Sequence, residues 1–401
     1  MNIFKKLFCR IYQGAFRLVL PLLPYREPKI LNSLNEIPDL LLKMNIKSAM
    51  LVTDAGIRGF GITKPLEDLL KKNKINLAVY DKTRANPTVQ NVEEAREQYL
   101  NEKCECLIAF GGGSAMDCAK ALGARIAYPK KSLNQLKGLL KVIRKIPTLI
   151  AIPTTAGTGS ETTLAAVITD SEKQHKYTLM DFTFIPSYAV LDPTVTFTLP
   201  PHLTSTTGMD ALTHAVEAFI GRSTTRETRA KALEATKLVF ENIERAYKNG
   251  KDTEARANML KAAYLAGIAF SKSYVGYIHA IAHSLGGQYN IPHGLANAVI
   301  MPYVLEEYGS SVYQKLHKLA VVAGVSEKNE PYKKSAEKFI EAIKKLNKNM
   351  NIPEKIENVK KEDVALMAAH ADKEANPLYP VPKLMNAKQL EKLYYKVADV
   401  K

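Results

Sequence analysis

The feature that most constrains the fold is a regular alternation of short apolar runs and helical segments in the first half of the chain. Apolar runs of strand length lie at residues 48–53, 77–80, 106–110 and 148–152. Helical periodicity lies between them, at residues 64–72, 89–101 and 115–127. This alternation predicts a parallel sheet with helices on both faces. Further strands, some of them antiparallel, are expected at residues 166–169, 177–180 and 188–191.

The second half of the chain has a different pattern. Strand patterns vanish after Pro200, and long helical stretches follow at residues 210–220, 227–249, 255–272, 296–307, 312–323, 332–347 and 361–371. A chain of 401 residues is also too long for one ordinary core. We therefore expect an N-terminal extension at residues 1–26, an α/β domain at residues 27–195 and an all-α domain at residues 196–401.

The chain carries a formal net charge of +16. Nucleic-acid binding, affinity for anionic lipid and a generally Lys-rich surface would each explain such a charge. The Lys-rich surface is favoured, because acids are interleaved with the basic residues and the sequence has no nucleic-acid-binding motif. We expect no nucleic-acid partner. The four cysteines lack the spacing of a zinc site, which favours free thiols in a reducing cytoplasm.

The first 26 residues contain five basic residues and no acid, with apolar residues at helical spacing. Arg17 interrupts the apolar run, which argues against a secretory signal, and the run is too short to span a membrane. A cationic amphipathic helix that ends near Pro21 is therefore predicted. It could lie on a membrane surface, contact a partner or pack on its own protein, and packing on its own protein is slightly favoured.

A glycine-rich loop, Gly111-Gly-Gly-Ser-Ala-Met-Asp117, joins the apolar run at 106–110 to a helix. Glycines let backbone N–H groups approach a phosphate closely, and the start of a helix adds free N–H groups and a positive dipole end. Ser114 and Asp117 have the spacing of a capping box. A plain tight turn is the alternative, so the loop alone indicates phosphate binding only moderately.

A second loop, Ile152-Pro-Thr-Thr-Ala-Gly-Thr-Gly-Ser160, also follows a predicted strand and offers hydroxyl groups suited to a phosphate or ribose. Loops at the carboxyl ends of parallel strands are where α/β sheets bind ligands. Asp54 follows the first predicted strand, where a carboxylate can accept hydrogen bonds from ribose hydroxyls and repel a 2′-phosphate. The two loops predict a nucleotide site, and Asp54 favours NAD over NADP.

Histidines cluster in two segments of the predicted helical domain. Asp210 and His214 are spaced i and i+4 on one helix face, His279 and His283 repeat that spacing, and His293 lies in a Pro/Gly turn ten residues later. A set of imidazoles and a carboxylate suits a catalytic divalent metal such as Fe²⁺ or Zn²⁺. Unrelated histidines in helical cores are the alternative, but two pairs and a third histidine favour a metal site.

The sequence resembles the iron-dependent (group III) alcohol dehydrogenase family between about residues 48 and 308. The motifs that carry the resemblance are GGGSAMD at 111–117, IPTTAGTGSE at 152–161, GMDALTHAVEA at 208–218 and HAIAHSLGGQYNIPHGLANAVIMP at 279–302. The resemblance implies a Rossmann-like domain followed by an all-α domain, similar to dehydroquinate synthase. It also implies a homodimer.

The resemblance implies roles for individual residues. The implied metal ligands are Asp210, His214, His279 and His293, and His283 is an implied catalytic residue in proton transfer. Asp54 is implied to select NAD. The other implied cofactor-binding residues are Asn86, Gly112, Gly113, Ser114, Asp117, Thr154, Thr155, Thr158 and Lys176. Phe270 is implied to lie near the substrate.

These observations predict a metal-dependent oxidoreductase that transfers a hydride between NAD(H) and a small primary alcohol, diol or aldehyde, with Fe²⁺ or Zn²⁺ as the metal. One alternative is a dehydroquinate-synthase-like lyase that uses NAD and a metal on the same scaffold. The other is a non-catalytic scaffold protein in which residues 1–26 make the functional contact.

Overall fold

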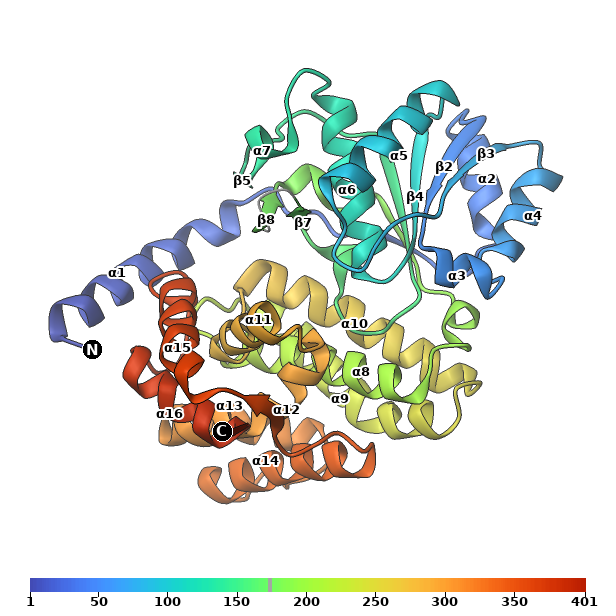
Figure 1. Cartoon of the computed structure of the whole chain (residues 1–401). Helices are drawn as coiled ribbons and strands as arrows, with labels where there is room; N and C mark the ends of the chain where they lie inside the picture. The colour runs from blue at the N-terminus through green and yellow to red at the C-terminus, as the bar shows by residue number, and fades with distance from the viewer. Residues whose placement is uncertain (172–174) are drawn as a thin grey trace. The chain divides into compact units, whose positions relative to one another are not determined.

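The computed structural model describes residues 1–171 and 175–401, which form two compact units (Figure 1). The first unit is Pro24–Thr198. The second consists of Leu199–Lys401 together with the N-terminal segment Met1–Leu23. The chain therefore leaves the second unit at residue 24 and returns to it at residue 199.

A six-stranded parallel sheet forms the centre of the α/β unit, with strand order β1-β9-β6-β4-β2-β3. The strands are β1 Lys29–Leu31, β2 Ser48–Val52, β3 Asn76–Tyr80, β4 Cys106–Gly111, β6 Thr148–Pro153 and β9 Tyr188–Val190. The four strands predicted between residues 48 and 152 all lie in this sheet. Their parallel pairing confirms the fold class predicted for the first half of the chain.

Both faces of the sheet are buried, because alternate side chains of each strand enter different cores. In β2, Met50 and Val52 pack into one core while Ala49 and Leu51 pack into the other. Strands buried on both faces read as continuous apolar runs in the sequence, which is why they were recognisable. The helices of this unit are α2 Glu36–Lys43, α3 Ala55–Gly59, α4 Lys64–Lys72, α5 Val89–Asn101, α6 Gly113–Ala127 and α7 Leu133–Leu136.

A smaller sheet completes the α/β unit. Its strands are β5 Gly138–Leu139, β7 Ala165–Asp170 and β8 His175–Met180. Strands β7 and β8 are antiparallel, while β5 pairs with β8 in parallel. The antiparallel pair agrees with the expectation for residues 166–180.

The strand order reverses between β2 and β4. The chain runs from β2 outward to β3 and then returns to add β4 on the opposite side of β2. The carboxyl ends of two such strands form a crevice where open α/β sheets bind ligands. Asp54 and the glycine loop therefore follow the two strands that border this point.

The second unit is almost entirely helical, as predicted. Its long helices are α8 Pro201–Ile220, α9 Arg226–Lys248, α10 Thr253–Ser273, α11 Tyr277–Tyr289, α12 His293–Tyr308, α13 Tyr313–Val322, α14 Tyr332–Asn349, α15 Lys361–Ala375 and α16 Ala387–Val397. A short parallel pair, β10 Ile356–Val359 and β11 Ala398–Val400, is present as well. These strands were not predicted, because four- and three-residue segments carry too little pattern.

Helix α8 begins nine residues before the position predicted from its apolar periodicity. The first turns contain a run of Ser and Thr, which are poor indicators of a helix interior. Here the hydroxyls bond back within the helix: Thr206 donates to the His202 carbonyl at 2.8 Å, and Thr207 to the Leu203 carbonyl at 2.7 Å. Pro201 supplies a favourable first helical residue.

The predicted amphipathic helix at the N-terminus is present as α1, Ile3–Val19. It packs on its own protein through a face that includes Cys9, Gln13 and Leu20, and it leaves most of its apolar face exposed. This differs from ordinary self-packing, in which the apolar face would be buried. Within the described residues, the helices are all too short or too polar to cross a membrane.

Candidate active site

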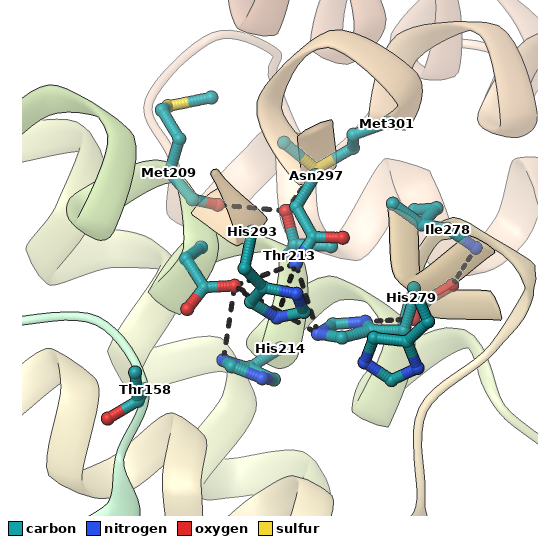
Figure 2. A network of polar contacts seen from close by, with 12 residues as sticks. Thr158, Met209, Thr213, His214, Ile278, His279, His293, Asn297 and Met301 are labelled. Atoms are coloured by element: carbon teal, nitrogen blue, oxygen red, sulfur yellow. Dashed lines mark hydrogen bonds and ion pairs between the residues drawn. The ribbon is translucent and has the colours of Figure 1, made fainter. Parts of the chain in front are cut away.

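Three helices of the second unit bring four predicted metal ligands together (Figure 2). Asp210 and His214 come from α8, His279 comes from α11, and His293 is the first residue of α12. One ligand atom of each residue lies within 4.8 Å of the ligand atoms of the other three. Residues separated by up to 83 positions thus form one group of three imidazoles and one carboxylate.

The Asp210 carboxylate is central to this group. Its Oδ1 atom lies 3.4 Å from His293 Nε2 and 4.0 Å from both His279 Nε2 and His214 Nδ1. Three of the four side chains are buried, while the side chain of His293 is 38% exposed. The group is therefore accessible on the His293 side, and a catalytic metal site requires such an open position for substrate.

Glu217, a buried residue two turns after Asp210 on α8, holds His279 in place. Its Oε2 atom accepts hydrogen bonds from His279 Nδ1 and from the Gly276 N–H, each at 2.7 Å. Its Oε1 atom accepts from the Ile278 N–H at 2.8 Å. With Nδ1 bound to Glu217, the other ring nitrogen of His279 faces Asp210, as in carboxylate–histidine–metal triads.

Glycine is required at position 276 for this arrangement. A Cβ atom built on Gly276 would lie 2.6 Å from Glu217 Oε1, far inside van der Waals contact. The backbone N–H of Gly276 donates a hydrogen bond to Glu217, which brings the carboxylate close to the Gly276 backbone. Gly276 thus allows the loop before α11 to approach α8.

Asn297 lies one turn after His293 on α12 and contacts most of the group (Figure 2). Its Nδ2 atom donates to Asp210 Oδ1 at 2.7 Å and lies 3.1 Å from His293 Nε2 and 3.3 Å from His279 Nε2. Phe270 stacks on the ring of His214 with centroids 4.1 Å apart. These contacts restrict the orientations of the Asp210, His214, His279 and His293 side chains.

Two histidines of the group, His279 and His293, are held in the neutral form that metal binding needs. Burial, followed by the neighbouring imidazoles, lowers the pKa of His279 well below its usual value. Burial also lowers the pKa of His293 to about 4, although Asp210 opposes the change. Three imidazoles and a carboxylate are a donor set that fits Fe²⁺ or Zn²⁺.

His283 lies beside this group with a different set of contacts. Its ring stacks on His293 at a centroid distance of 5.2 Å, and its Nδ1 atom lies 2.7 Å from Glu374 Oε1. The hydroxyl of Tyr379 donates to the same carboxylate oxygen at 2.7 Å. Burial opposes protonation, but the hydrogen bond and charge of Glu374 outweigh it and raise the pKa of His283. His283 can therefore carry a proton more readily than His279 and His293.

The two predicted nucleotide loops lie side by side in the α/β unit. A Cβ atom at Gly112 would meet Thr155 Oγ1 at 3.6 Å, and one at Gly113 would meet Thr158 Cγ2 at 3.4 Å. The Thr154 N–H donates to the Gly111 carbonyl at 3.1 Å, which joins the loops at their start. Glycine at positions 112 and 113 leaves the space between the loops open. Helix α6 begins at Gly113, so its free N–H groups face this space, and the loops fit a pyrophosphate.

The remaining predicted cofactor residues surround these loops. The Asn86 N–H donates to Ser114 Oγ at 3.4 Å, and Lys176 Nζ donates to Asn86 Oδ1 at 3.0 Å. Asp54 lies close to the start of the glycine loop, since a Cβ atom built on Gly111 would lie 3.9 Å from Asp54 Oδ2. The carboxylate of Asp54 also accepts the Ile57 N–H at 2.9 Å and so caps α3.

The predicted capping box at Ser114 and Asp117 is wrong. Helix α6 begins at Gly113 with Gly112 as its N-cap, which places Ser114 inside the first turn. Asp117 instead accepts hydrogen bonds from the Val167 N–H at 3.1 Å and from Ser160 Oγ at 3.4 Å. The glycines start the helix earlier than the capping pattern suggested, so Asp117 connects the helix to the second loop and to β7.

Four residues of the site were missed in the sequence. Glu217 and Asn297 had a usable signal, because Glu217 shares a helix face with Asp210 and His214, and Asn297 follows His293 at i+4. Glu374 and Tyr379 had none, since they lie about 90 residues from His283 and only the tertiary fold brings them to it.

Comparison with known proteins gives consistent matches along the chain. Residues 31–193 match the family model described as iron-containing alcohol dehydrogenase, and residues 204–398 match that of the C-terminal part of the Fe-containing alcohol dehydrogenase family. Alcohol dehydrogenase 4 of Saccharomyces cerevisiae is 38% identical over 343 residues, which cover 84% of this chain and 88% of the yeast protein.

Two further relatives agree. The NAD-dependent methanol dehydrogenase of Bacillus methanolicus is 36% identical over 341 residues, which cover 84% of this chain and 89% of that enzyme. The crystal structure of a 1,3-propanediol oxidoreductase superposes with a TM-score of 0.88 at 32% identity, covering 93% of this chain and 98% of the other. The chain therefore belongs to the iron-containing alcohol dehydrogenase family and is an oxidoreductase of that family.

Proposed function

We propose that this chain interconverts a small primary alcohol or diol and the corresponding aldehyde, with NAD as the hydride carrier and Fe²⁺ or Zn²⁺ as the metal. The observation that carries the proposal is the group of Asp210, His214, His279 and His293, whose ligand atoms lie within 4.8 Å of one another. The names of the relatives support the substrate class, since they act on an alcohol, methanol or 1,3-propanediol.

The metal would be held by these four side chains. When bound, a divalent metal supplies a Lewis acid that polarises the substrate oxygen and lowers the pKa of an alcohol. Glu217 fixes the ring orientation of His279, and Asn297 fixes the carboxylate of Asp210. Because these partners are buried, the donor set is preorganised and little reorientation is needed on binding.

NAD would bind to the α/β unit. Its nicotinamide ring supplies the hydride acceptor or donor of the reaction. Gly112 and Gly113 leave room for the pyrophosphate, with Thr155 and Thr158 as neighbouring hydroxyl donors. Asp54, at the end of β2, would accept hydrogen bonds from the adenosine ribose and disfavour a 2′-phosphate.

His283 is the group best placed to move the proton. Its Nδ1 atom is bound to Glu374, which leaves Nε2 to accept a proton in alcohol oxidation and to donate one in aldehyde reduction. The Glu374 carboxylate stabilises the protonated imidazole, and Tyr379 orients that carboxylate. This contact distinguishes His283 from His279 and His293, whose pKa values are lowered.

We also propose that the enzyme works in the cytoplasm as a homodimer. The four cysteines are buried free thiols, which suits a reducing compartment. Sedimentation velocity of the purified chain measures the oligomeric state directly.

The decisive experiment is His279→Ala, measured for bound metal and for turnover. The wild-type protein loaded with Fe²⁺ or Zn²⁺ should accumulate NADH from short primary alcohols or diols in the steady state, which a lyase would not do. His279→Ala should lose bound metal and activity together. The matched control is His317→Ala, which removes a buried histidine bound to Ser335 elsewhere in the same unit. Full activity of His279→Ala would reject the proposal.

A further inference from the structure

Helix α1 presents a continuous apolar face that the protein does not cover. Phe4, Ile11 and Leu18 are 79%, 62% and 77% exposed. Their spacing places them on one side of the helix. The other large exposed apolar residues of this segment are Ile3, Leu7, Phe8, Tyr12, Val19 and Leu22. Such a concentration of exposed apolar side chains marks an interaction surface.

The opposite face of α1 is anchored to the helical unit. Gln13 Nε2 donates to the carbonyl of Tyr379 at 2.8 Å, and Arg10 donates to the carbonyls of Val381 and Pro382 at 2.8 and 2.9 Å. Phe16 packs against Tyr274 with centroids 5.0 Å apart. Figure 1 shows α1 at the edge of this unit beside α15, where Lys5 pairs with Asp372. These buried polar contacts fix the helix with its apolar side outward.

Basic residues border the apolar face. Lys6, Arg10 and Arg17 follow one another at spacings of four and seven residues, which places them along one edge of the helix. Lys6 and Arg10 also line a surface groove of 540 Å³ with Ile3, Leu7 and Lys383. A ligand on the apolar face would therefore meet positive charge at its border.

The positive charge continues beyond the helix. Burial, together with the neighbouring charges of Arg222, Arg229, Arg17 and Lys318, lowers the pKa of Lys315 to about 8. Two acids near this surface are paired with basic residues: Asp372 with Lys5, and Glu307 with Lys383 and Lys396. The surroundings of the apolar face are thus positive overall, in a chain whose net charge is +16.

We propose that α1 docks the enzyme on an anionic lipid surface. An apolar helix face inserts at the level of the headgroups and acyl chains, while the exposed side chains of Lys6 and Arg17 contact anionic headgroups. A helix of 17 residues is about 25 Å long and would lie in the plane of the surface. A second copy of the chain is a poorer occupant, because pairing two such faces would bring like charges together.

Vesicle sedimentation of the full-length protein tests this proposal. The protein should co-sediment with phosphatidylcholine vesicles that contain phosphatidylglycerol, and at least about tenfold less with phosphatidylcholine alone or at high salt. The double substitution Phe8→Glu and Ile11→Glu should lower binding to the anionic vesicles at least about a hundredfold, because two inserted side chains become charged. Its dehydrogenase activity without vesicles should remain that of the wild type, which shows that the variant is folded.

The matched control is the double substitution Phe60→Glu and Ile143→Glu, which changes two exposed apolar residues of the α/β unit. It should bind vesicles like the wild type. The proposal is overturned if the wild type does not bind anionic vesicles, or if the α1 variant binds them equally well. It is also overturned if, without vesicles, the α1 variant dissociates from an oligomer that the wild type forms, since the face would then serve a second copy.

Discussion

At the scale of single residues, the contacts of each histidine decide its chemistry. Burial and the neighbouring imidazoles lower the pKa values of His279 and His293. The hydrogen bond and charge of Glu374 raise the pKa of His283. The same side chain type thus supplies neutral metal ligands and a proton carrier within a few ångströms. Sequence spacing identified the residues and the family resemblance implied their roles, and the contact of His283 with Glu374 gives the physical difference between them.

Glu374→Gln should change the pH dependence of alcohol oxidation. His283 must be neutral to accept the proton, so turnover rises with pH through the pKa of His283. Removing the Glu374 charge removes the cause that raises this pKa, and the midpoint should move to lower pH. The measurement is kcat against pH with saturating alcohol and NAD. An unchanged midpoint would mean that His283 is not the proton acceptor.

Asp54→Ser should relax the preference for NAD. The serine hydroxyl keeps an N-cap acceptor for α3, so the melting temperature should stay close to that of the wild type. Loss of the carboxylate removes its repulsion of a 2′-phosphate, and the kcat/KM ratio of NADP to NAD should rise about tenfold or more. Steady-state kinetics with both cofactors measure the ratio. If the ratio stays constant, Asp54 does not select the cofactor.

At the scale of elements, the β4–α6 loop and the loop after β6 act together. Each was recognised separately in the sequence, but their contact through Gly112, Gly113, Thr155 and Thr158 depends on the neighbouring positions of β4 and β6 in the sheet. The four central strands predicted between residues 48 and 152 were predictable because both sheet faces are buried. The start of α6 was mispredicted, because Ser114 and Asp117 mimic a cap.

Gly113→Val should weaken NAD binding. Even the Cβ atom would lie 3.4 Å from Thr158 Cγ2, and the two methyl groups would fill the space between the loops. We expect the KM for NAD to rise about tenfold or more while bound metal is unchanged. The control is Gly59→Val, since a Cβ atom at Gly59 meets nothing within 4 Å. Equal effects of the two substitutions would count against a cofactor role for the loop.

At the scale of the whole molecule, the metal group connects segments that are distant in sequence. It joins α8, α11 and α12, so a metal bound there would stabilise the helical unit as a cross-link does. A ligand present at about a thousand times its Kd stabilises the native state by about 4 kcal/mol. The metal should therefore matter for folding as well as for turnover.

Removing the metal with a chelator should lower the free energy of unfolding of the metal-loaded protein by about 4 kcal/mol. Denaturant unfolding followed by circular dichroism, with and without chelator, measures the change. His279→Ala should show little response to the chelator, because it has already lost a ligand. If the chelator does not change the free energy of unfolding of the wild-type protein, the four side chains do not bind a metal.

The sequence by itself determined the two-part architecture and which residues are candidate metal ligands. Alternating apolar runs specify a buried parallel sheet, and i, i+4 spacing places Asp210 and His214 on one helix face whatever the rest of the chain does. Only the tertiary structure decided that Glu374 and Tyr379 reach His283, and that α1 leaves most of its apolar face exposed. The physical reason is that periodicity within one helix or strand decides which side chains share a face. Packing between segments distant in sequence decides which residues contact that face.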